Sequence, residues 1–124
     1  LKDYVSEVPS IAYDLIANAM YPLSIIFEEG KNLAKNVSSD KSVCIRVVDN
    51  ELCKEVIRQL GRPITSTSAN LSGQPSALTF NEISEDVKQS VDYIVGLYHD
   101  TIGKPKSSTI IKLHSDNTFE IIRQ

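Results

Sequence analysis

The strongest constraint on the fold is the alternation of short apolar runs with helical patterns along the 124 residues. The clearest strand is the run 43–48, which is β-branched and apolar except for Arg46. The pair 49–50 then provides an N-cap, apolar residues recur at helical spacing up to Leu60, and Gly61 ends the helix. Because strands alternate with helices, the sequence predicts an α/β fold with a mixed sheet.

The same reasoning predicts the other elements of this fold. Helices are expected over 9–20, where apolar residues follow helical spacing, and from a capping box at 79–82 toward Val87. Strands are expected at 23–27, 63–67, 92–97, 108–113 and 118–122, the last two joined by a turn at 115–117. No repeat or linker divides the chain, so we predict one domain over residues 1–124.

Composition argues against several classes of protein. The 13 basic and 16 acidic residues give a net charge of −3, whereas a dedicated binder of nucleic-acid phosphates is normally basic. No apolar run approaches the roughly 18 to 20 residues that span a bilayer, so no membrane partner is expected. Cys44 and Cys53 form no metal-ligand pair at a usual spacing. They are interpreted as two reduced and mostly buried thiols of a cytoplasmic protein.

Residues 64–76 form an uncharged run crowded with hydroxyl side chains. Ser66, Ser68 and Asn70 are spaced two apart, so in a strand all three would line one wall of a pocket. Residues 72–76 suggest a turn whose backbone N–H groups and hydroxyls hold phosphate oxygens. An ordinary surface turn is the open alternative. The run has neither the ending of a Walker loop nor the pattern of a nucleophile elbow.

Arg46 is the second candidate, because a guanidinium within an apolar strand is unfavourable unless it is paired. Either it projects into a cleft and clamps a carboxylate or phosphate, or the strand alternates so that it points to solvent. A second hydroxyl-rich loop lies at Lys104–Thr109, for which ligand binding and plain solvation are both open.

The remaining titratable residues suggest no catalytic centre. His99 and His114 have no partner at a useful spacing and are interpreted as surface or edge residues. The carboxylates form no evident acid–base pair. The sequence therefore predicts no metal site, no Ser-His-Asp arrangement and no cysteine nucleophile.

Five segments together form a recognisable signature. They are YPLSII at 21–26, SVCIRV at 42–47, STSANLSGQPS at 66–76, STII at 108–111 and IIR at 121–123. In order and spacing, from about Tyr21 to Gln124, the chain resembles the YrdC-like threonylcarbamoyl-AMP synthases. The long hydroxyl motif is highly specific and the other segments are weak alone, with Cys44 standing where the family usually has Gly.

The resemblance implies a fold and an activity. The fold is a twisted mixed sheet flanked by helices, the YrdC-like (DHBP synthase-like) fold. Such enzymes are nucleotidyltransferases, L-threonylcarbamoyladenylate synthases, which join L-threonine, bicarbonate and ATP and release pyrophosphate. ATP is then a substrate, with Mg²⁺ held mainly by its phosphates. A partner complex transfers the threonylcarbamoyl group to a tRNA adenosine, so tRNA is an indirect partner.

The resemblance also assigns roles to individual residues. Threonine would be held by Arg46, Ser66 and Ser108. ATP would be faced by Ser42, Ser68, Asn70, Ser76 and Arg123. No residue receives a catalytic role or a metal, because catalysis in such a site is mostly positioning and charge stabilisation.

Two motifs of the family have no counterpart in this sequence. They are a first strand with Tyr-Pro-Thr-Asp-Thr-x-Tyr-Gly and a basic Lys-x-Arg…Lys-Pro-Leu loop that grips the triphosphate. We therefore expect a fold that is incomplete at the N-terminus and a chain with little activity alone. The truncated sheet would leave apolar surface through which the chain associates with another copy.

Two further functions stay open. Family members have been described as binding double-stranded RNA, so one alternative is a translation-associated module that binds double-stranded RNA or tRNA. The acidic balance of charge weighs against it. The other alternative is a structural remnant whose pocket is no longer used.

Overall fold

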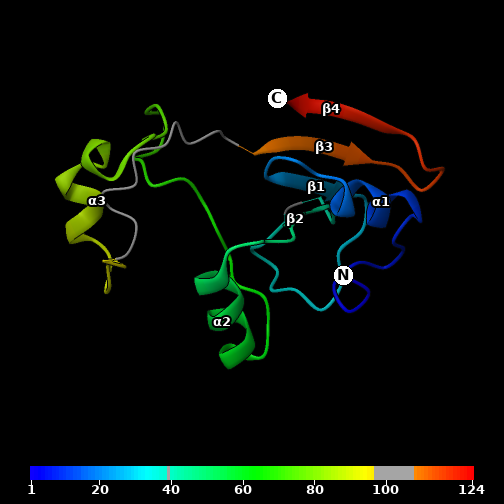
Figure 1. The fold of residues 1–124 in the computed structure, drawn as a ribbon, viewed down its shortest axis with the longest axis horizontal. Helices are drawn as coiled ribbons and strands as arrows, with labels where there is room; N and C mark the ends of the chain where they lie inside the picture. The colour runs from blue at the N-terminus through cyan, green and yellow to red at the C-terminus, as the bar shows by residue number, and fades with distance from the viewer. Residues whose placement is uncertain (39, 97–107) are drawn as a thin grey trace. The chain divides into compact units, whose positions relative to one another are not determined.

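The computed structural model describes residues 1–38, 40–96 and 108–124 (Figure 1). Its helices are α1 (Ile11–Ala17), α2 (Glu51–Leu60), the short 3-10 helix η1 (Phe80–Glu82) and α3 (Glu85–Gln89). Its strands are β1 (Leu23–Phe27), β2 (Val43–Arg46), β3 (Thr109–Leu113) and β4 (Phe119–Arg123). The chain divides into a sheet unit, Leu1–Val56 with Lys106–Gln124, and a loop unit, Ile57–Pro105.

The sheet unit confirms the predicted mixed sheet. Its strand order is β2-β1-β3-β4, with β1 parallel to β3 and the other two pairs antiparallel. The tight turn between β3 and β4 forms because Asn117 adopts a φ of 66° and Asp116 accepts hydrogen bonds from Thr118. The strands predicted at 23–27, 108–113 and 118–122 are confirmed to within one residue, and that at 43–48 ends two residues early.

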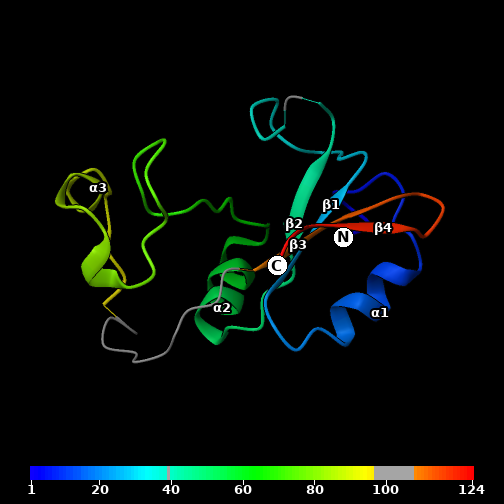
Figure 2. The same cartoon turned by 90° about the horizontal axis from the view of Figure 1, so that it is seen from above.

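One face of the sheet carries the core. Period-two alternation places Ile25 and Phe27 of β1 beside Ile111 and Leu113 of β3, and all four are at most 3% exposed. Helix α1 lies against this face through its fully buried Ala12 (Figure 2). The opposite face is free to carry polar groups, and the candidate site lies there.

Helix α2 begins and ends where the sequence predicts. Asn50 Oδ1 accepts a hydrogen bond of 3.1 Å from the backbone N–H of Cys53, as an N-cap should. Lys54 adds ion pairs of 2.5 Å to Asp49 and 3.1 Å to Glu51. Gly61 ends the helix at a φ of +70°, a left-handed conformation that side-chain-bearing residues adopt only with strain.

The loop unit corrects two strand predictions. Residues 63–68 and 93–96 form no strand, and the described part of this unit, 57–96, contains no buried residue. A strand requires hydrogen bonds to a neighbouring strand, and the described residues of this unit provide none. The apolar runs that predicted these strands therefore have no strand partner among the described residues.

The capping-box prediction at 79–82 is also wrong. Thr79 makes no side-chain cap, and Glu82 accepts its hydrogen bond from the backbone N–H of Leu78. The chain makes one 3-10 turn there and begins α3 only at Glu85. That helix is capped by Ser84, whose Oγ accepts from the N–H of Val87.

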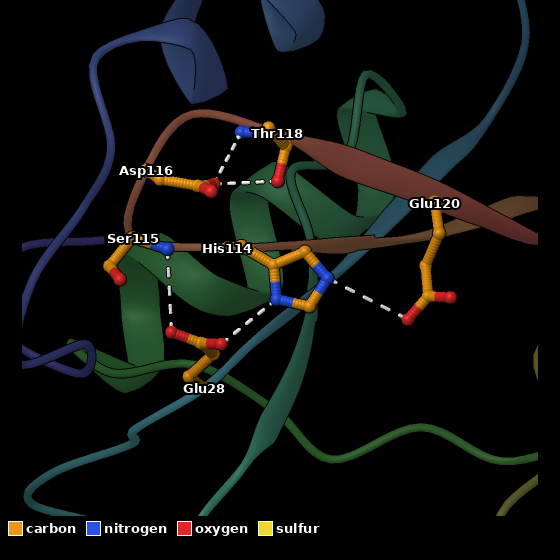
Figure 3. Close-up of polar contacts among 6 residues, drawn as sticks. All are labelled: Glu28, His114, Ser115, Asp116, Thr118 and Glu120. Atoms are coloured by element: carbon orange, nitrogen blue, oxygen red, sulfur yellow. Dashed lines mark hydrogen bonds and ion pairs between the residues drawn. The ribbon is translucent and has the colours of Figure 1, made fainter.

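His114 is not isolated, which corrects the sequence-based interpretation. Its Nδ1 lies 2.9 Å from a carboxylate oxygen of Glu28, and its Nε2 lies 3.7 Å from Glu120 (Figure 3). Because Phe27 pairs with Leu113 in the parallel β1–β3 ladder, Glu28 and His114, which directly follow the two strands, lie side by side. The contact joins residues 86 positions apart, so local spacing gives no sign of it.

We expect the Glu28 contact to make stability depend on pH. The hydrogen bond from His114 holds the pKa of Glu28 below its ordinary value of 4.5, although partial burial opposes this. A lowered folded-state pKa contributes stability above the unfolded pKa and loses it as pH falls through the folded value. Glu28→Gln should therefore lower the free energy of unfolding at pH values above 4.5, with a difference from wild type that shrinks as the pH falls below 4.5.

Urea denaturation at several pH values measures this dependence. Glu29→Gln removes a neighbouring carboxylate that makes no side-chain hydrogen bond or ion pair with the described residues, so it is the matched control. A Glu28→Gln curve parallel to wild type over the whole acid range would contradict the prediction.

Candidate functional site

The polar groups of the sheet unit form one row across the open face of the sheet. Ser24 of β1 pairs with Arg46 of β2 on one side and with Ile110 of β3 on the other, and Ile110 pairs with Arg123 of β4. Residues directly opposite each other in a sheet share a face. The register therefore brings two arginines predicted from sequence onto the same face, one on each edge strand.

Ser108 joins this row through hydrogen bonds. It directly precedes β3, and its Oγ lies 3.1 Å from the Oγ of Ser24. The Arg123 guanidinium donates to the Ser108 carbonyl oxygen at 3.0 Å and contacts its Oγ at 3.4 Å. The structure thus joins Ser108 and Arg123, two predicted site residues, by direct contact, and adds Ser24 as a second partner of Ser108.

Arg46 lies on the exposed side of β2. Val43 is buried on the core face, whereas Cys44 and Arg46 are exposed, because the strand alternates between its two faces. The prediction that the cysteines are mostly buried is therefore wrong, since Cys44 is exposed and Cys53 is only partly buried. The Arg46 guanidinium is therefore open to solvent and needs no partner to offset burial. Its role as a carboxylate clamp stays a prediction that its position on the row favours.

Ser42 lies away from this row. Its Oγ donates a hydrogen bond of 2.7 Å to Asp40, and with Ser38 this holds the pKa of Asp40 below its ordinary value. Ser42 precedes β2 and is four residues from Arg46, which corresponds to about 13 Å along an extended strand. The structure does not bring Ser42 together with Arg46, Ser108 and Arg123.

The hydroxyl run of the loop unit presents its groups to solvent. Ser66, Ser68 and Ser76 are exposed. The Asn70 amide nitrogen donates to the carbonyl oxygens of Leu71, at 2.9 Å, and of Gln74, at 3.0 Å, and so ties the loop together. The loop is a true turn, since Gly73 adopts a φ of +80°.

Asn70 also carries the clearest sign of a ligand in this loop. Its Oδ1 is buried and has no hydrogen-bond partner among the described residues. A buried acceptor without a donor is unfavourable, and a ligand N–H or O–H group would satisfy it. The sequence marked Asn70 through the motif, and the structure adds that one of its atoms is unsatisfied.

Several predicted features remain untested by the geometry. Arg46, Ser108 and Arg123 belong to the sheet unit, and Ser66, Ser68, Asn70 and Ser76 belong to the loop unit, so their union in one pocket stays a prediction. Residues 104–107 of the second hydroxyl loop and His99 lie outside the described residues.

Among the residues described, no group of three or more His, Cys, Asp or Glu side chains is placed to hold a metal ion. None of the described helices has the length and apolar character that crossing a bilayer requires.

Comparison with known proteins decides the family. The Sua5/YciO/YrdC family model, described as telomere recombination, matches residues 1–124. The chain belongs to the Sua5/YciO/YrdC family. The match begins earlier than Tyr21, where the recognised motifs start, so α1 and the segment before it also belong to the family domain.

Curated relatives of this Sua5/YciO/YrdC chain carry an enzyme name. A putative threonylcarbamoyl-AMP synthase of Methanocaldococcus jannaschii is 37% identical over 101 residues, which are 81% of this chain and 45% of the relative. A threonylcarbamoyl-AMP synthase of Vibrio campbellii is 38% identical over 84 residues, 67% of this chain and 42% of the relative. No solved structure gives a significant match. The chain thus spans less than half of the length of these relatives.

Proposed function

We propose that this chain forms the threonine- and nucleotide-facing part of a threonylcarbamoyl-AMP synthase. The observation that carries the proposal is the row of Arg46, Ser24, Ser108 and Arg123 on the open face of the sheet. Guanidinium groups and hydroxyls are the donors that recognise carboxylates and phosphates. L-Threonine offers a carboxylate and ATP offers phosphates, so the row suits both substrates.

In this proposal each group has a positioning task. Arg46 holds the threonine carboxylate by two parallel hydrogen bonds, and Ser66 and Ser108 complete the threonine site. Ser42, Ser68, Asn70 and Ser76 face the nucleotide, which Arg123 closes over. No protein nucleophile is needed, because threonine, bicarbonate and ATP themselves supply the reacting atoms and the enzyme aligns them.

Magnesium has no protein site in this scheme. No acidic cluster of the described residues fits a divalent cation, so Mg²⁺ would arrive on the ATP phosphates and no step is assigned to it. The product would pass to a transfer complex that acts on tRNA in the cytoplasm.

No observation favours the RNA-binding alternative, since the chain is acidic and its relatives are named as synthases. Salt-dependent binding of tRNA in a gel shift would support the RNA-binding alternative. The predicted self-association has a candidate location at the edge strand β4, where Phe119, Ile121 and Ile122 are 45–53% exposed.

This chain is expected to bind L-threonine without catalysing the synthase reaction. Calorimetry is expected to show binding of L-threonine that strengthens with a non-hydrolysable ATP analogue, because the carboxylate donors are present. Threonine-dependent release of pyrophosphate is expected to be absent, because the sequence lacks the family's basic triphosphate loop. Absence of binding for both ligands would favour the structural-remnant alternative, and turnover at the rate of a typical synthetase would refute the expectation of little activity.

A further inference from the structure

We propose that Ser24 is a positioning residue that aims the hydroxyl of Ser108 at the ligand, so that Ser108 donates its proton to a carboxylate oxygen. This rests on the proposed function, because it concerns the same threonine site. Ser24 is 8% exposed and is the one buried polar side chain among the residues described. The sequence places it within the YPLSII segment at 21–26 but assigns it no role.

The position of Ser24 is fixed by the sheet. It lies on β1, one of the two central strands, and pairs with Arg46 on β2 and Ile110 on β3. Its Oγ is 3.1 Å from the Oγ of Ser108. The Arg123 guanidinium lies 3.4 Å from the same oxygen. The Ser108 hydroxyl therefore contacts both a buried hydroxyl and a cation.

Counting donors and acceptors gives the direction of these bonds. A guanidinium has only donors, so Ser108 Oγ is the acceptor of the contact from Arg123. The buried hydroxyl of Ser24 needs an acceptor, and Ser108 Oγ is the hydrogen-bond partner that the structure shows for it. A hydroxyl oxygen accepts two hydrogen bonds and donates one. With both acceptor positions used, Ser108 keeps its own proton for a further partner.

Because both acceptor positions of Ser108 Oγ are used, its ligand partner must be a hydrogen-bond acceptor. A donor such as the threonine ammonium finds no free lone pair there, whereas a carboxylate oxygen accepts the proton. Arg46 occupies the same row beyond Ser24, so the carboxylate would be bound by one guanidinium and one oriented hydroxyl. Ser24 contributes without touching the ligand.

The test compares Ser24→Ala with Ser24→Thr in the full chain, and Ser115→Ala at the exposed turn is the control. Titration with L-threonine measures affinity, and NMR relaxation of the Arg123 side-chain Nε–H group measures how firmly Arg123 is held. Ser24→Ala is expected to weaken threonine binding about fivefold and to increase the motion of Arg123. Ser24→Thr and Ser115→Ala should match wild type in both readouts.

The two readouts separate this inference from the proposed function. If wild type binds no threonine but Ser24→Ala still mobilises Arg123, the positioning role stands and the proposed function fails. If wild type binds threonine and Ser24→Ala changes neither affinity nor motion, the positioning role is overturned. Binding of L-threoninol, which lacks the carboxylate, as tightly as L-threonine would also overturn it.

Discussion

Arg46→Ala is expected to weaken binding of L-threonine by about 10- to 100-fold, the loss that follows when a charge-assisted hydrogen-bonded pair is removed. The reason is the position of Arg46 on the row with Ser24, on the face of the sheet opposite the core. Because the side chain is exposed, its removal should leave the fold intact. Calorimetry measures the affinity, and far-ultraviolet circular dichroism checks the fold.

Two variants show whether threonine binding depends on the two parallel hydrogen bonds of the guanidinium or only on its positive charge. Arg46→Lys keeps the charge but loses the two parallel hydrogen bonds, so it should recover only part of the affinity. Lys112→Ala removes a cation from another row of the same face and should bind threonine as wild type does. Equal losses in Arg46→Ala and Lys112→Ala would mean that net charge attracts the ligand and that Arg46 is no specific clamp.

The sequence predicts the sheet unit well because its signals are local. The alternation in 23–27 and 43–46 and the turn at 115–117 are complete within a few residues, and each also agrees with the sheet that forms. The caps of α2 are equally local. Asn50 and Gly61 lie next to the backbone groups that they satisfy.

Apart from the capping box at 79–82, the failures concern partners distant in sequence. The runs at 63–67 and 92–96 have strand-like composition, but composition cannot supply the neighbouring strand that would pair with them. The contact of Glu28 with His114 and that of Ser24 with Ser108 each join residues more than 80 positions apart. They follow from the parallel pairing of β1 with β3, which the sequence does not specify.

Phe27→Ala is expected to cost about 3–5 kcal/mol of unfolding free energy, the usual range for removing a buried aromatic ring. Phe27 is 1% exposed and pairs with Val43 on one side and Leu113 on the other, both of them buried. The core cluster has few other members: Val5, Ala12, Ile25 and Ile111. A small core has few side chains that can shift into the cavity, so the loss of unfolding free energy should lie toward the upper end of this range. Urea denaturation followed by circular dichroism measures it, since the chain has no Trp.

Phe119→Ala is the matched control, because it removes the same ring from the same sheet. Phe119 pairs with Leu113 from the edge strand β4 and is 45% exposed. Its loss should cost about 1–2 kcal/mol, since a half-exposed ring loses only part of the transfer free energy and leaves no enclosed cavity. A loss of unfolding free energy for Phe119→Ala as large as that for Phe27→Ala would contradict this. It would mean that another surface packs against β4 in solution. A dependence of that cost on protein concentration would identify the cover as a second copy of the chain, as the exposed apolar residues of β4 suggest.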